Sequence, residues 1–508
     1  MSKITLKLTN QLKENANVQI IKDEARDRWY TGAELAADVD QLDDQLRGLN
    51  IGHGDVVYVC LPNSGLYPVL TQAIWEIGAV MNPVSANTPA AEMLADLKEH
   101  DYAAVIVAAD LVDAVVDNRE TTRADLTLNT ADQLTVIRDT AVTGHVAATP
   151  TEEDLALILH TSGTTGKPKR VGLTHDLIRH GAQHDIDAHK LTAADTTLIT
   201  MPMFHINAQV VSVLSTRLSS GKMVITPKFS ASRFWPQVQT NGVTWASVVP
   251  TIINILLLND KAKAAYNDQT HLRFVRCSSF SLPLEKLTDF EDTYHTRILE
   301  GYGMTETASQ CTLNPFDKPK VGSVGLPVGT DMAILVDGDF TTEPGQSGEI
   351  AVRGDHVIKS YMDPHPDSFK DGWFLTGDLG YFDDDGYLYI NGRKKDIISV
   401  GGEKVAPARV ENVLSELEFI KEITVIGTPD DLYGESVTAV VISRPGSGSQ
   451  AEQEAAIFDQ AKKALAGYEQ PKRVLFVHDY PRNATGKVLR PKLRDLVVND
   501  AEQLGEGA

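Results

Sequence analysis

The stretch LALILHTSGTTGKPK, residues 155–169, decides how this chain folds. Its first five residues are apolar and predict a buried strand, and the segment from His175 onward predicts a helix. Between the two lies a loop of small, hydroxyl-bearing and basic residues. Ligands of open α/β sheets bind at loops that follow strands in this way. We therefore expect a ligand site at this loop.

The loop has the composition of a phosphate-binding site. Its glycines let the backbone turn sharply and present N–H groups to an anion, while its hydroxyls and lysines add donors and positive charge. A Walker loop is excluded, because Pro168 stands where that motif needs its second glycine. A linker that binds nothing is the remaining alternative. The candidate phosphate-binding residues are Thr161, Ser162, Gly163, Thr164, Thr165, Gly166, Lys167 and Lys169.

Length, charge and cysteine content restrict the class of protein. At 508 residues the chain is too long for one core and should form two or more domains. A net charge of -22 disfavours general binding to nucleic acid or to anionic membranes. Its three cysteines are widely spaced and make neither a disulfide framework nor a metal knuckle. Because we find no signal sequence or membrane-spanning run, we expect a cytoplasmic protein.

Short apolar runs alternate with helix-length amphipathic segments between residues 55 and 300. This alternation predicts parallel sheets with helices on both faces. After residue 302, short strands rich in glycine, valine and aspartate predict a small antiparallel, barrel-like subdomain. The strands predicted in these two parts are 56–61, 103–107, 155–159, 197–200, 223–225, 245–249 and 274–275, followed by 348–354 and 387–390.

The C-terminal part has the pattern of a separate α+β unit. Residues 422–427 and 437–443 predict paired strands, and a helix near 452–466 and a strand at 474–477 follow. The charged, turn-prone stretch 391–396 suggests the boundary, although a solvated hairpin has the same composition. We predict an α/β fold with a large N-terminal domain, residues 1–394, and a smaller, mobile C-terminal domain, residues 395–508.

Four further motifs follow in a fixed order along the chain. They are YGMTE at 302–306, GWFLTGD at 372–378, GRKKDI at 392–397 with GGEKVAP at 401–407, and PRNATGK at 481–487. Together with the loop at 161–169 they resemble the motifs of the adenylate-forming superfamily, which includes acyl-CoA synthetases, luciferases and peptide-synthetase adenylation domains. One such string could arise by chance, but five in register over nearly the whole chain carry the resemblance.

The resemblance implies an ATP-dependent, AMP-forming acid–CoA ligase that uses ATP, Mg²⁺ and CoA. In such enzymes a carboxylate attacks the α-phosphorus of ATP and pyrophosphate leaves, and CoA then attacks the acyl adenylate and releases AMP. Because the first step gathers negative charge on phosphate oxygens, cations and N–H donors should dominate catalysis. The nearest likeness is to oxalyl-CoA synthetase-like ligases, with a weaker likeness to carnitine-type ligases.

The resemblance also implies roles for single residues around ATP. The loop would hold the β- and γ-phosphates, Thr305 would donate to phosphate, and Glu306 would help to bind magnesium. The residues implied to bind adenosine are Glu300, Gly301 and Tyr302 for adenine, and Asp378 and Arg393 for ribose.

Matching positions in the C-terminal part imply a domain movement. Lys487 corresponds to the lysine that bridges the substrate carboxylate and the α-phosphate, so its role depends on domain closure. After adenylation the C-terminal domain would rotate about Lys395, the hinge position of the family. This rotation would replace Lys487 with a CoA-binding stretch that leaves space for the pantetheine arm. The residues implied there are Gly401, Gly402 and Lys404.

The acid pocket of the family corresponds to residues 203–207, 244–250 and 277–281. Phe280 stands where many relatives have glycine or alanine, which favours a short or compact acid such as oxalate. Against oxalate, Asn207 replaces a second histidine expected after His205. Phe280 could also be an ordinary core residue. The candidate pocket residues are His205, which we also count as catalytic, Asn207, Ser279 and Phe280.

Three alternatives to a short-acid CoA ligase remain. They are an enzyme that loads an acyl carrier protein, a medium- or long-chain fatty acid–CoA ligase, and a non-catalytic adenylate-binding protein on the same fold. Retention of Glu306, Asp378, Arg393 and Lys487 argues against the last. The oligomeric state is open between monomer and homodimer.

Two further patterns resemble metal sites. His175, His180, His184 and His189 lie on one predicted helix, but Gly181 stands where a zinc protease needs glutamate, and we interpret the four histidines as an exposed helix face. The sequence DDDG at 383–386 resembles a calcium loop, yet Tyr381 occupies its first ligand position. We interpret it as a hairpin turn.

Overall fold

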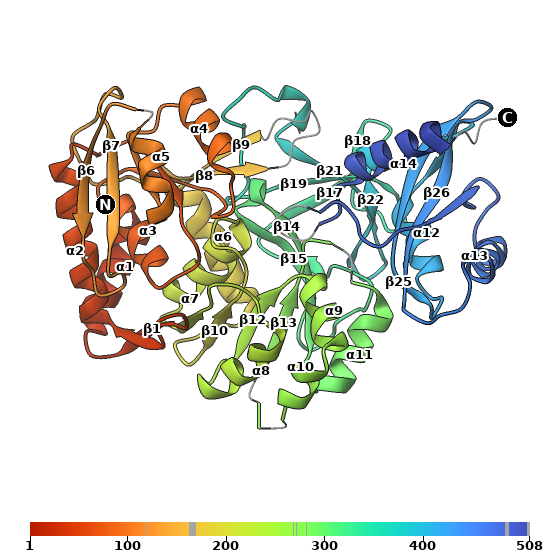
Figure 1. Ribbon diagram of the computed structural model, residues 1–508, viewed down its shortest axis with the longest axis horizontal. Helices are drawn as coiled ribbons and strands as arrows, with labels where there is room; N and C mark the ends of the chain where they lie inside the picture. Colours follow the sequence, from red (N-terminus) through yellow and green to blue (C-terminus); the bar gives the residue numbers. More distant parts are fainter. Residues whose placement is uncertain are drawn as a thin grey trace.

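Figure 1 shows the computed structural model, which describes residues 1–117, 119–161, 169–267, 269–270, 272–280, 282–482 and 487–504, with side chains up to residue 499. Four sheets are present in these residues. Two large mixed sheets with helices occupy the N-terminal part, a small antiparallel sheet follows, and a fifth of the chain forms a further α+β unit. The predicted α/β class and the antiparallel subdomain are confirmed.

The first large sheet has seven strands. Its parallel centre consists of β4, β3 and β5, which are formed by apolar runs such as VVYVC. Such runs are typical of strands that are covered on both faces, and every residue of these three strands except Val56 is buried. The strands, in sheet order, are β6 Thr121–Leu126, β7 Leu134–Asp139, β5 Ala104–Val107, β3 Val56–Cys60, β4 Val80–Pro83, β8 Leu155–Thr161 and β9 Lys169–Thr174.

The second large sheet has nine strands and a parallel centre that runs from β1 to β14. The carboxyl ends of its strands lead into the predicted acid-pocket and adenosine residues. In sheet order the strands are β16 Leu326–Pro327, β15 Ser309–Leu313, β14 Ile298–Met304, β13 Phe274–Cys277, β12 Trp245–Val248, β10 Thr196–Ile199, β11 Lys222–Ile225, β1 Gln19–Asp23 and β2 Arg28–Thr31.

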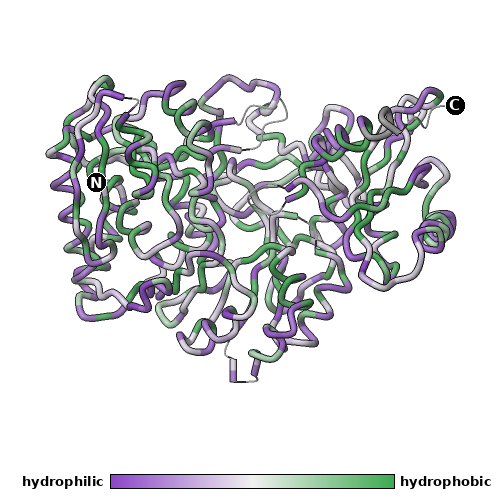
Figure 2. Tube along the Cα trace, in the orientation of Figure 1, coloured by the Kyte–Doolittle hydropathy of each residue, from purple (hydrophilic) through white to green (hydrophobic). Residues whose placement is uncertain are grey.

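One continuous core joins these two sheets. Val57 and Leu157 of the first sheet belong to the same buried cluster as Leu198 and Val224 of the second. Figure 2 shows the apolar residues concentrated along the central strands, with hydrophilic residues on the outer helices. The helices of this part are α1 Lys3–Glu14, α2 Gly32–Gly48, α3 Leu66–Glu76, α4 Ala90–Glu99, α5 Val112–Val116, α6 His175–His189, α7 Ser215–Leu218, α8 Ala231–Thr240, α9 Pro250–Leu258, α10 Asp260–Ala265 and α11 Leu284–Tyr294.

A small antiparallel sheet follows the second large sheet in the chain. Its long central strand carries the motif GD at 377–378 and pairs Asp378 with Arg393 of the next strand. The strands are β17 Asp331–Val336, β18 Asp339–Thr341, β19 Gly348–Arg353, β20 Phe369–Lys370, β21 Trp373–Phe382 and β22 Leu388–Arg393. The sheet therefore sets the relative position of two predicted ribose-binding residues.

The last part of the chain has its own sheet and its own buried clusters. Its strands β25 and β26 pair over ten residues as predicted, and Figure 1 shows this unit at the blue end of the chain. Its elements are β23 Ile398–Val400, β24 Glu403–Val405, α12 Pro407–Leu414, β25 Ile420–Asp430, β26 Gly434–Ser443, α13 Gln450–Ala464, β27 Arg473–Phe476 and α14 Arg490–Leu504. The domain boundary after residue 394 stays a prediction.

The strand predicted at 155–159 and the helix predicted from His175 are confirmed, but the expectation that the loop connects this strand to this helix is wrong. Strand β9 follows the loop and pairs antiparallel with β8, so that Thr161 lies opposite Lys169. Helix α6 begins only after this strand, with Thr174 as its N-cap. The loop therefore closes a β-hairpin. Ser162, Gly163, Thr164, Thr165, Gly166 and Lys167 lie outside the described residues.

The interpretation of the four histidines as an exposed helix face is also wrong. His175 and His189 are fully buried, because α6 packs between the two large sheets and against α1 and β15. His175 contacts the Ser2 hydroxyl, and His189 stacks on Trp245 and Phe274. Burial lowers the pKa of each, to about 4 for His175 and about 3 for His189. Both are therefore neutral core residues.

The turn at 383–386 forms the hairpin between β21 and β22, as interpreted. Asp383 accepts hydrogen bonds from the backbone N–H groups of Asp385 and Tyr387, and Lys320 pairs with both acidic side chains. The Lys320 ammonium thus compensates part of the negative charge of Asp383 and Asp385.

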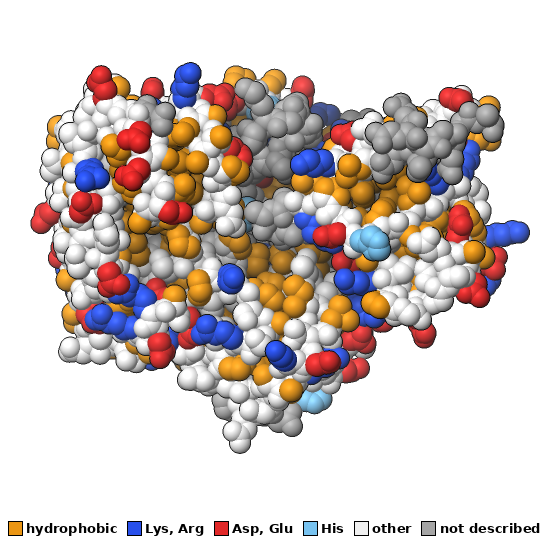
Figure 3. All heavy atoms as spheres, viewed as in Figure 1, with side chains coloured by type: hydrophobic (Ala, Val, Ile, Leu, Met, Phe, Trp, Pro, Cys, Tyr) orange, Lys and Arg blue, Asp and Glu red, His pale blue; other side chains and the backbone are white. Residues whose placement is uncertain are grey.

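In the described residues, no helix is long and apolar enough to cross a membrane. Figure 3 shows Lys and Arg side chains interspersed with Asp and Glu over the face that it presents.

Candidate active site

Three of the predicted adenosine-binding side chains meet at the end of β14 and on the β21–β22 pair. The Tyr302 hydroxyl donates to Oδ2 of Asp378 over 2.7 Å. Nε of Arg393 lies 2.8 Å from the other carboxylate oxygen, Oδ1. Tyr302 and Asp378 are buried, and burial followed by the neighbouring Asp378 charge raises the pKa of Tyr302 well above its ordinary value. The tyrosine is therefore a permanent donor to this carboxylate.

Two further residues of the same strand are constrained by packing. Burial raises the pKa of the Glu300 carboxyl to about 7, although the backbone N–H groups of Gly322 and Leu282 act in the opposite direction. At Gly301 a Cβ atom would lie 2.9 Å from the carbonyl oxygen of Thr312, so only glycine fits without a shift. A larger side chain therefore does not fit at Gly301, next to Tyr302, without a shift of β15.

Glu306 lies in a short turn after β14 and is linked to the stem of the hairpin loop. Its Oε1 accepts a hydrogen bond of 2.8 Å from Tyr361, and Nζ of Lys169 lies 4.4 Å from the centre of the Tyr361 ring. Glu306 and Tyr361 are buried, and Thr305 next to Glu306 is half-buried. In the described part of the chain Oε2 of Glu306 accepts no hydrogen bond.

Lys487, from the last part of the chain, faces the adenosine group. Burial, and after it the Arg393 guanidinium, lower the pKa of Lys487 to about 8, while Asp378 acts in the opposite direction. Lys395 and Asp396 also act on this ammonium. Lys487 thus interacts electrostatically with residues that precede it by about a hundred positions, and its role in adenylation stays a prediction.

Of the remaining C-terminal candidates, Lys395 lies next to this group, whereas Gly401, Gly402 and Lys404 contact other residues. Lys395 lies in a turn directly after β22, where burial and then Arg393 lower its pKa. Gly401 and Gly402 have φ values of 59° and 95° and form the tight turn between β23 and β24. Lys404 donates to the Ser399 hydroxyl over 2.6 Å, and a Cβ atom at Gly401 would lie 2.9 Å from the ring of Tyr433.

The acid-pocket candidates His205 and Asn207 stand at the beginning of a π-helix, Asn207–Leu214. Such helices are rare and concentrate at functional sites. Burial lowers the pKa of His205 to about 4, so its imidazole is neutral. The Asn207 Oδ1 accepts a hydrogen bond of 2.7 Å from Ser247 of β12. In the described residues, Nε2 of His205 and Nδ2 of Asn207 are buried without a hydrogen-bond partner.

A buried arginine lies behind Asn207. Nη1 of Arg276, on β13, donates to the hydroxyls of Ser247 and Ser278 over 3.3 Å and 2.6 Å. Arg276 and Ser247 are partners in the register of β12 and β13. A positive charge is thus connected to the Asn207 amide through one serine.

The other wall of the predicted pocket follows β13. Ser279 has a φ of 86°, a left-handed conformation that is uncommon for a side chain other than glycine and typical of functional loops. Phe280 is 37% exposed. It is therefore not part of the core, and the alternative that it is an ordinary core residue is wrong.

Three residues of the site were missed by sequence reasoning. Tyr361 connects Lys169 to Glu306, and Arg276 supports Asn207. Asn63 accepts from the Met203 N–H over 2.8 Å and donates to the Met201 carbonyl over 2.9 Å, which fixes the segment that leads to His205. Asn63 and Tyr361 come from segments without a motif, so only their burial as polar side chains, visible in the structure, marks them.

Known proteins share this architecture over the whole chain. The chain belongs to the AMP-binding enzyme family, because the model of that family matches residues 8–362 and the model of the AMP-binding enzyme C-terminal domain matches residues 409–487. The sequence resemblance to the adenylate-forming superfamily is confirmed.

Named relatives are CoA ligases. An oxalate–CoA ligase of Arabidopsis thaliana is 35% identical over 460 residues, which cover 86% of this chain and 87% of that protein. A sulfoacetate–CoA ligase of Cupriavidus necator is 34% identical over 474 residues, which cover 91% and 92%. The crystal structure of ATP-bound MatB from Rhodopseudomonas palustris superposes with a TM-score of 0.82 at 26% identity, over 96% of this chain and 98% of MatB. This protein is accordingly an AMP-forming acid–thiol ligase that uses ATP and CoA.

Proposed function

We propose that this enzyme makes the CoA thioester of a short acid that carries a second polar or anionic group, of the kind of oxalate or sulfoacetate. The main support is a pair of buried nitrogens without a partner in the described residues, Nδ2 of Asn207 and Nε2 of neutral His205. Nδ2 is a donor, and we assign the imidazole proton to Nε2, which makes it a donor as well. A hydrocarbon chain in the pocket would leave both donors without a partner, at a cost of about 1–3 kcal/mol for each. An anionic group would accept from both.

The fixed orientation of Asn207 strengthens this proposal. Since Ser247 binds its Oδ1, the amide nitrogen must point away from Ser247 and remains available to a ligand. The Arg276 guanidinium behind Ser247 adds a positive charge without entering the pocket. The amide nitrogen of Asn207 can therefore donate to a second anionic group of the acid, even though the histidine expected at this position is absent. Phe280, half-exposed beside the strained Ser279, would limit the length of the acid.

For the first half-reaction we assign the adenosine to Tyr302, Asp378 and Arg393. Each oxygen of Asp378 accepts one bond from the protein and has a lone pair left for a ribose hydroxyl. Lys487 would stand between the acid carboxylate and the α-phosphate. The carboxylate oxygen then forms a bond to phosphorus, and the bond to pyrophosphate breaks. The ammonium offsets the charge that gathers on the phosphate oxygens.

Magnesium fits one of these residues. Oε2 of Glu306 is a carboxylate oxygen without a donor in the described residues, while Tyr361 holds Oε1. Oxygen ligands of this kind are those that Mg²⁺ prefers. When bound, the ion would neutralise phosphate charge, and Thr305 and Lys169 would stand near the same phosphates.

For the second half-reaction we propose that the C-terminal domain, residues 395–508, turns about Lys395. The CoA thiolate then attacks the acyl carbon, and AMP leaves. In the arrangement that brings Lys487 to Asp378, Gly401 and Lys404 contact Tyr433 and Ser399 instead. A separate arrangement is needed to bring them to CoA.

A substrate screen tests the proposal. Pyrophosphate release and thioester formation are measured with oxalate, sulfoacetate, malonate, acetate, octanoate and benzoate, each with and without CoA. We expect the highest kcat/KM for an acid with two anionic groups. Octanoate as the best substrate would contradict the pocket argument, and pyrophosphate release without any thioester would favour loading of a carrier protein.

A variant separates the pocket from the rest of the enzyme. Asn207→Leu keeps the size of the side chain and removes the donor, so we expect a loss of about tenfold or more in kcat/KM for the preferred acid. The same variant should leave kcat/KM for acetate and the KM for ATP nearly unchanged. Equal losses for both acids would show that Asn207 acts only through the fold.

A further inference from the structure

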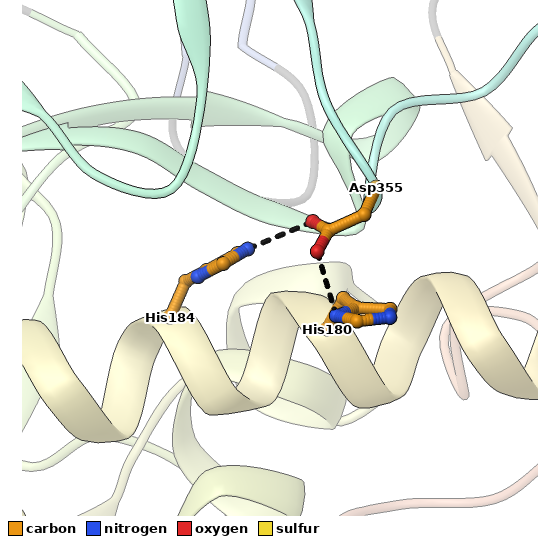
Figure 4. Close-up of side chains that lie close together, drawn as sticks. All are labelled: His180, His184 and Asp355. Carbon is orange, nitrogen blue, oxygen red and sulfur yellow. Dashed lines mark hydrogen bonds and ion pairs between the residues drawn. The ribbon is translucent and has the colours of Figure 1, made fainter.

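A second cluster of polar side chains lies away from the residues assigned above. Nδ1 of His180 lies 2.7 Å from Oδ2 of Asp355, and Nε2 of His184 lies 2.8 Å from Oδ1 of the same carboxylate. Figure 4 shows both imidazoles on one side of α6, pointing toward Asp355, which comes from the loop after β19. One ligand atom from each of the three residues lies within 4.8 Å of the other two.

We propose that His180, His184 and Asp355 bind a divalent transition metal ion, with Zn²⁺ as the best match. Two imidazoles and one carboxylate are a ligand set of catalytic zinc sites, with water completing the coordination. Residues four apart on a helix lie on the same face, so α6 presents both imidazoles to one ion. This site stands apart from the proposed CoA ligase function and from Glu306.

The geometry needs only small side-chain shifts. Zinc bonds of about 2.1 Å at tetrahedral angles place ligand atoms about 3.4 Å apart, against the hydrogen-bond distances of 2.7 and 2.8 Å seen here. Each imidazole and the carboxylate oxygen that it contacts would move apart by about 0.6 Å, and ligand atoms that now lie up to 4.8 Å apart would move closer to bind one ion. The side chains of His180 and His184 are only 26% and 19% exposed, while Asp355 at 44% keeps a path from solvent.

Surrounding groups support a cation at this place. Oδ1 of Asp176 lies 3.5 Å from Nε2 of His180 and would accept from this nitrogen once Nδ1 binds a metal. In the metal-free protein the Arg179 guanidinium donates to Nε2, so metal binding requires the other tautomer of His180. Arg179 is the cation in contact with His180, but it is paired with Asp176 and Glu152. Two carboxylates, those of Asp176 and Glu152, thus pair with this one guanidinium.

The site would join two parts of the enzyme. Helix α6 belongs to the packed core between the large sheets, whereas Asp355 begins the loop that also contacts Glu306 twice. Ile358 donates its backbone N–H to the Glu306 carbonyl, and Tyr361 donates to the Glu306 carboxylate. Buried His356 holds Asp355 from behind, 3.3 Å from Oδ1. Metal binding would thus fasten this loop to α6.

Zinc titration tests the proposal. The full-length enzyme is freed of metal with a chelator, returned to buffer with excess Mg²⁺, and titrated with Zn²⁺ in competition with a chromophoric chelator. We expect one Zn²⁺ per chain and, with Co²⁺ in its place, visible absorption bands typical of a site with four or five ligands. Absence of binding would overturn the proposal.

Variants locate the binding. Asp355→Asn and His184→Gln should each lower the Zn²⁺ affinity by about tenfold or more. His145→Ala is the matched control, because His145 pairs with Asp55 over 2.6 Å at the surface and should leave the affinity unchanged. Near-UV circular dichroism without metal confirms that each variant folds. Wild-type affinity in both site variants would contradict the proposal.

Discussion

The proposed adenosine side and the proposed acid side of the active site differ in how far the protein satisfies its own polar groups. Around adenosine, Tyr302, Asp378 and Arg393 bind one another before any ligand arrives. In the acid pocket the carbonyl of Asn207 is bound by Ser247, but its amide nitrogen and Nε2 of His205 have no partner in the described residues. The polar groups on the first side bind other protein groups, whereas two nitrogens on the second side have no partner in the described residues.

This contrast fits the different tasks of the two sides. Every AMP-forming ligase binds the same nucleotide, so its residues can be fixed in advance, which reduces the cost of ordering them. The acid differs between ligases, and the energy that selects it comes from buried donors that only the correct acid satisfies. Four predictions test this contrast, beginning with the largest effect.

Lys487→Ala should give the largest effect. Removing a half-buried ammonium that we assign to the phosphates should lower the rate of pyrophosphate release by about 10²–10³-fold. Thioester formation from supplied acyl adenylate should change much less, because Lys487 is assigned to the first half-reaction only. The two rates are measured separately, and equal losses in both would contradict the two-arrangement scheme.

Asp378→Asn should mainly weaken nucleotide binding. The variant keeps the shape of the side chain but loses the charge that Arg393 pairs with, which corresponds to about 1.5–3 kcal/mol for a charged hydrogen bond. We expect the KM for ATP to rise by about 10–100-fold, with the KM for the acid nearly constant. A parallel rise in both constants would show that the two sides are not independent.

The pH profile should follow the protonation of Lys487. Its pKa is lowered to about 8, so the ammonium is charged below that pH and the positive charge is lost as the pH rises. We expect kcat/KM for adenylation to fall about tenfold per pH unit above this value. Lys487→Arg stays charged over this range, so its lower activity should not fall in the same way. A flat wild-type profile up to pH 9.5 would contradict the assignment.

Tyr361→Phe should give the smallest effect. The ring remains above Lys169, and only the hydrogen bond to the Glu306 carboxylate is lost, which is about 1.5 kcal/mol, the low end for a bond to a charged group. We expect the Mg²⁺ concentration needed for half-maximal rate to change by about three- to tenfold, with the KM for the acid unchanged. An unaltered Mg²⁺ dependence would contradict the proposal that Glu306 binds Mg²⁺.

Much of the fold could be predicted because apolar runs mark the buried strands. Runs such as 56–61 and 245–249 coincide with β3 and β12 to within a residue. Strand β9 was missed because it has only two buried positions, Val171 and Leu173, and begins with two basic residues. Since we expected the loop to connect a strand to a helix, we expected neither the hairpin nor the pairing of β9 with β8.

The site was predictable where a short motif places residues, and not where distant segments meet. The motifs gave Tyr302, Asp378 and Arg393, and the structure brings these together, while their roles stay predictions. No local pattern connects Tyr361 to Glu306 or Asn63 to Met203. In the same way, the burial of His189 depends on Trp245 and Phe274, which lie far away in the sequence.

The π-helix that begins at Asn207 has a consequence for how the acid preference of this enzyme can change. Its C-terminal end continues directly into α7, which packs against α6 and β11. Deleting one residue within 208–214 would let the segment return to α-helical pairing and would rotate its free end by about 100°. His205 and Asn207 would then turn out of the pocket together, while every adenosine contact stayed in place. A change in chain length of a single residue, and not only a change of side chain, can therefore alter which acid is accepted.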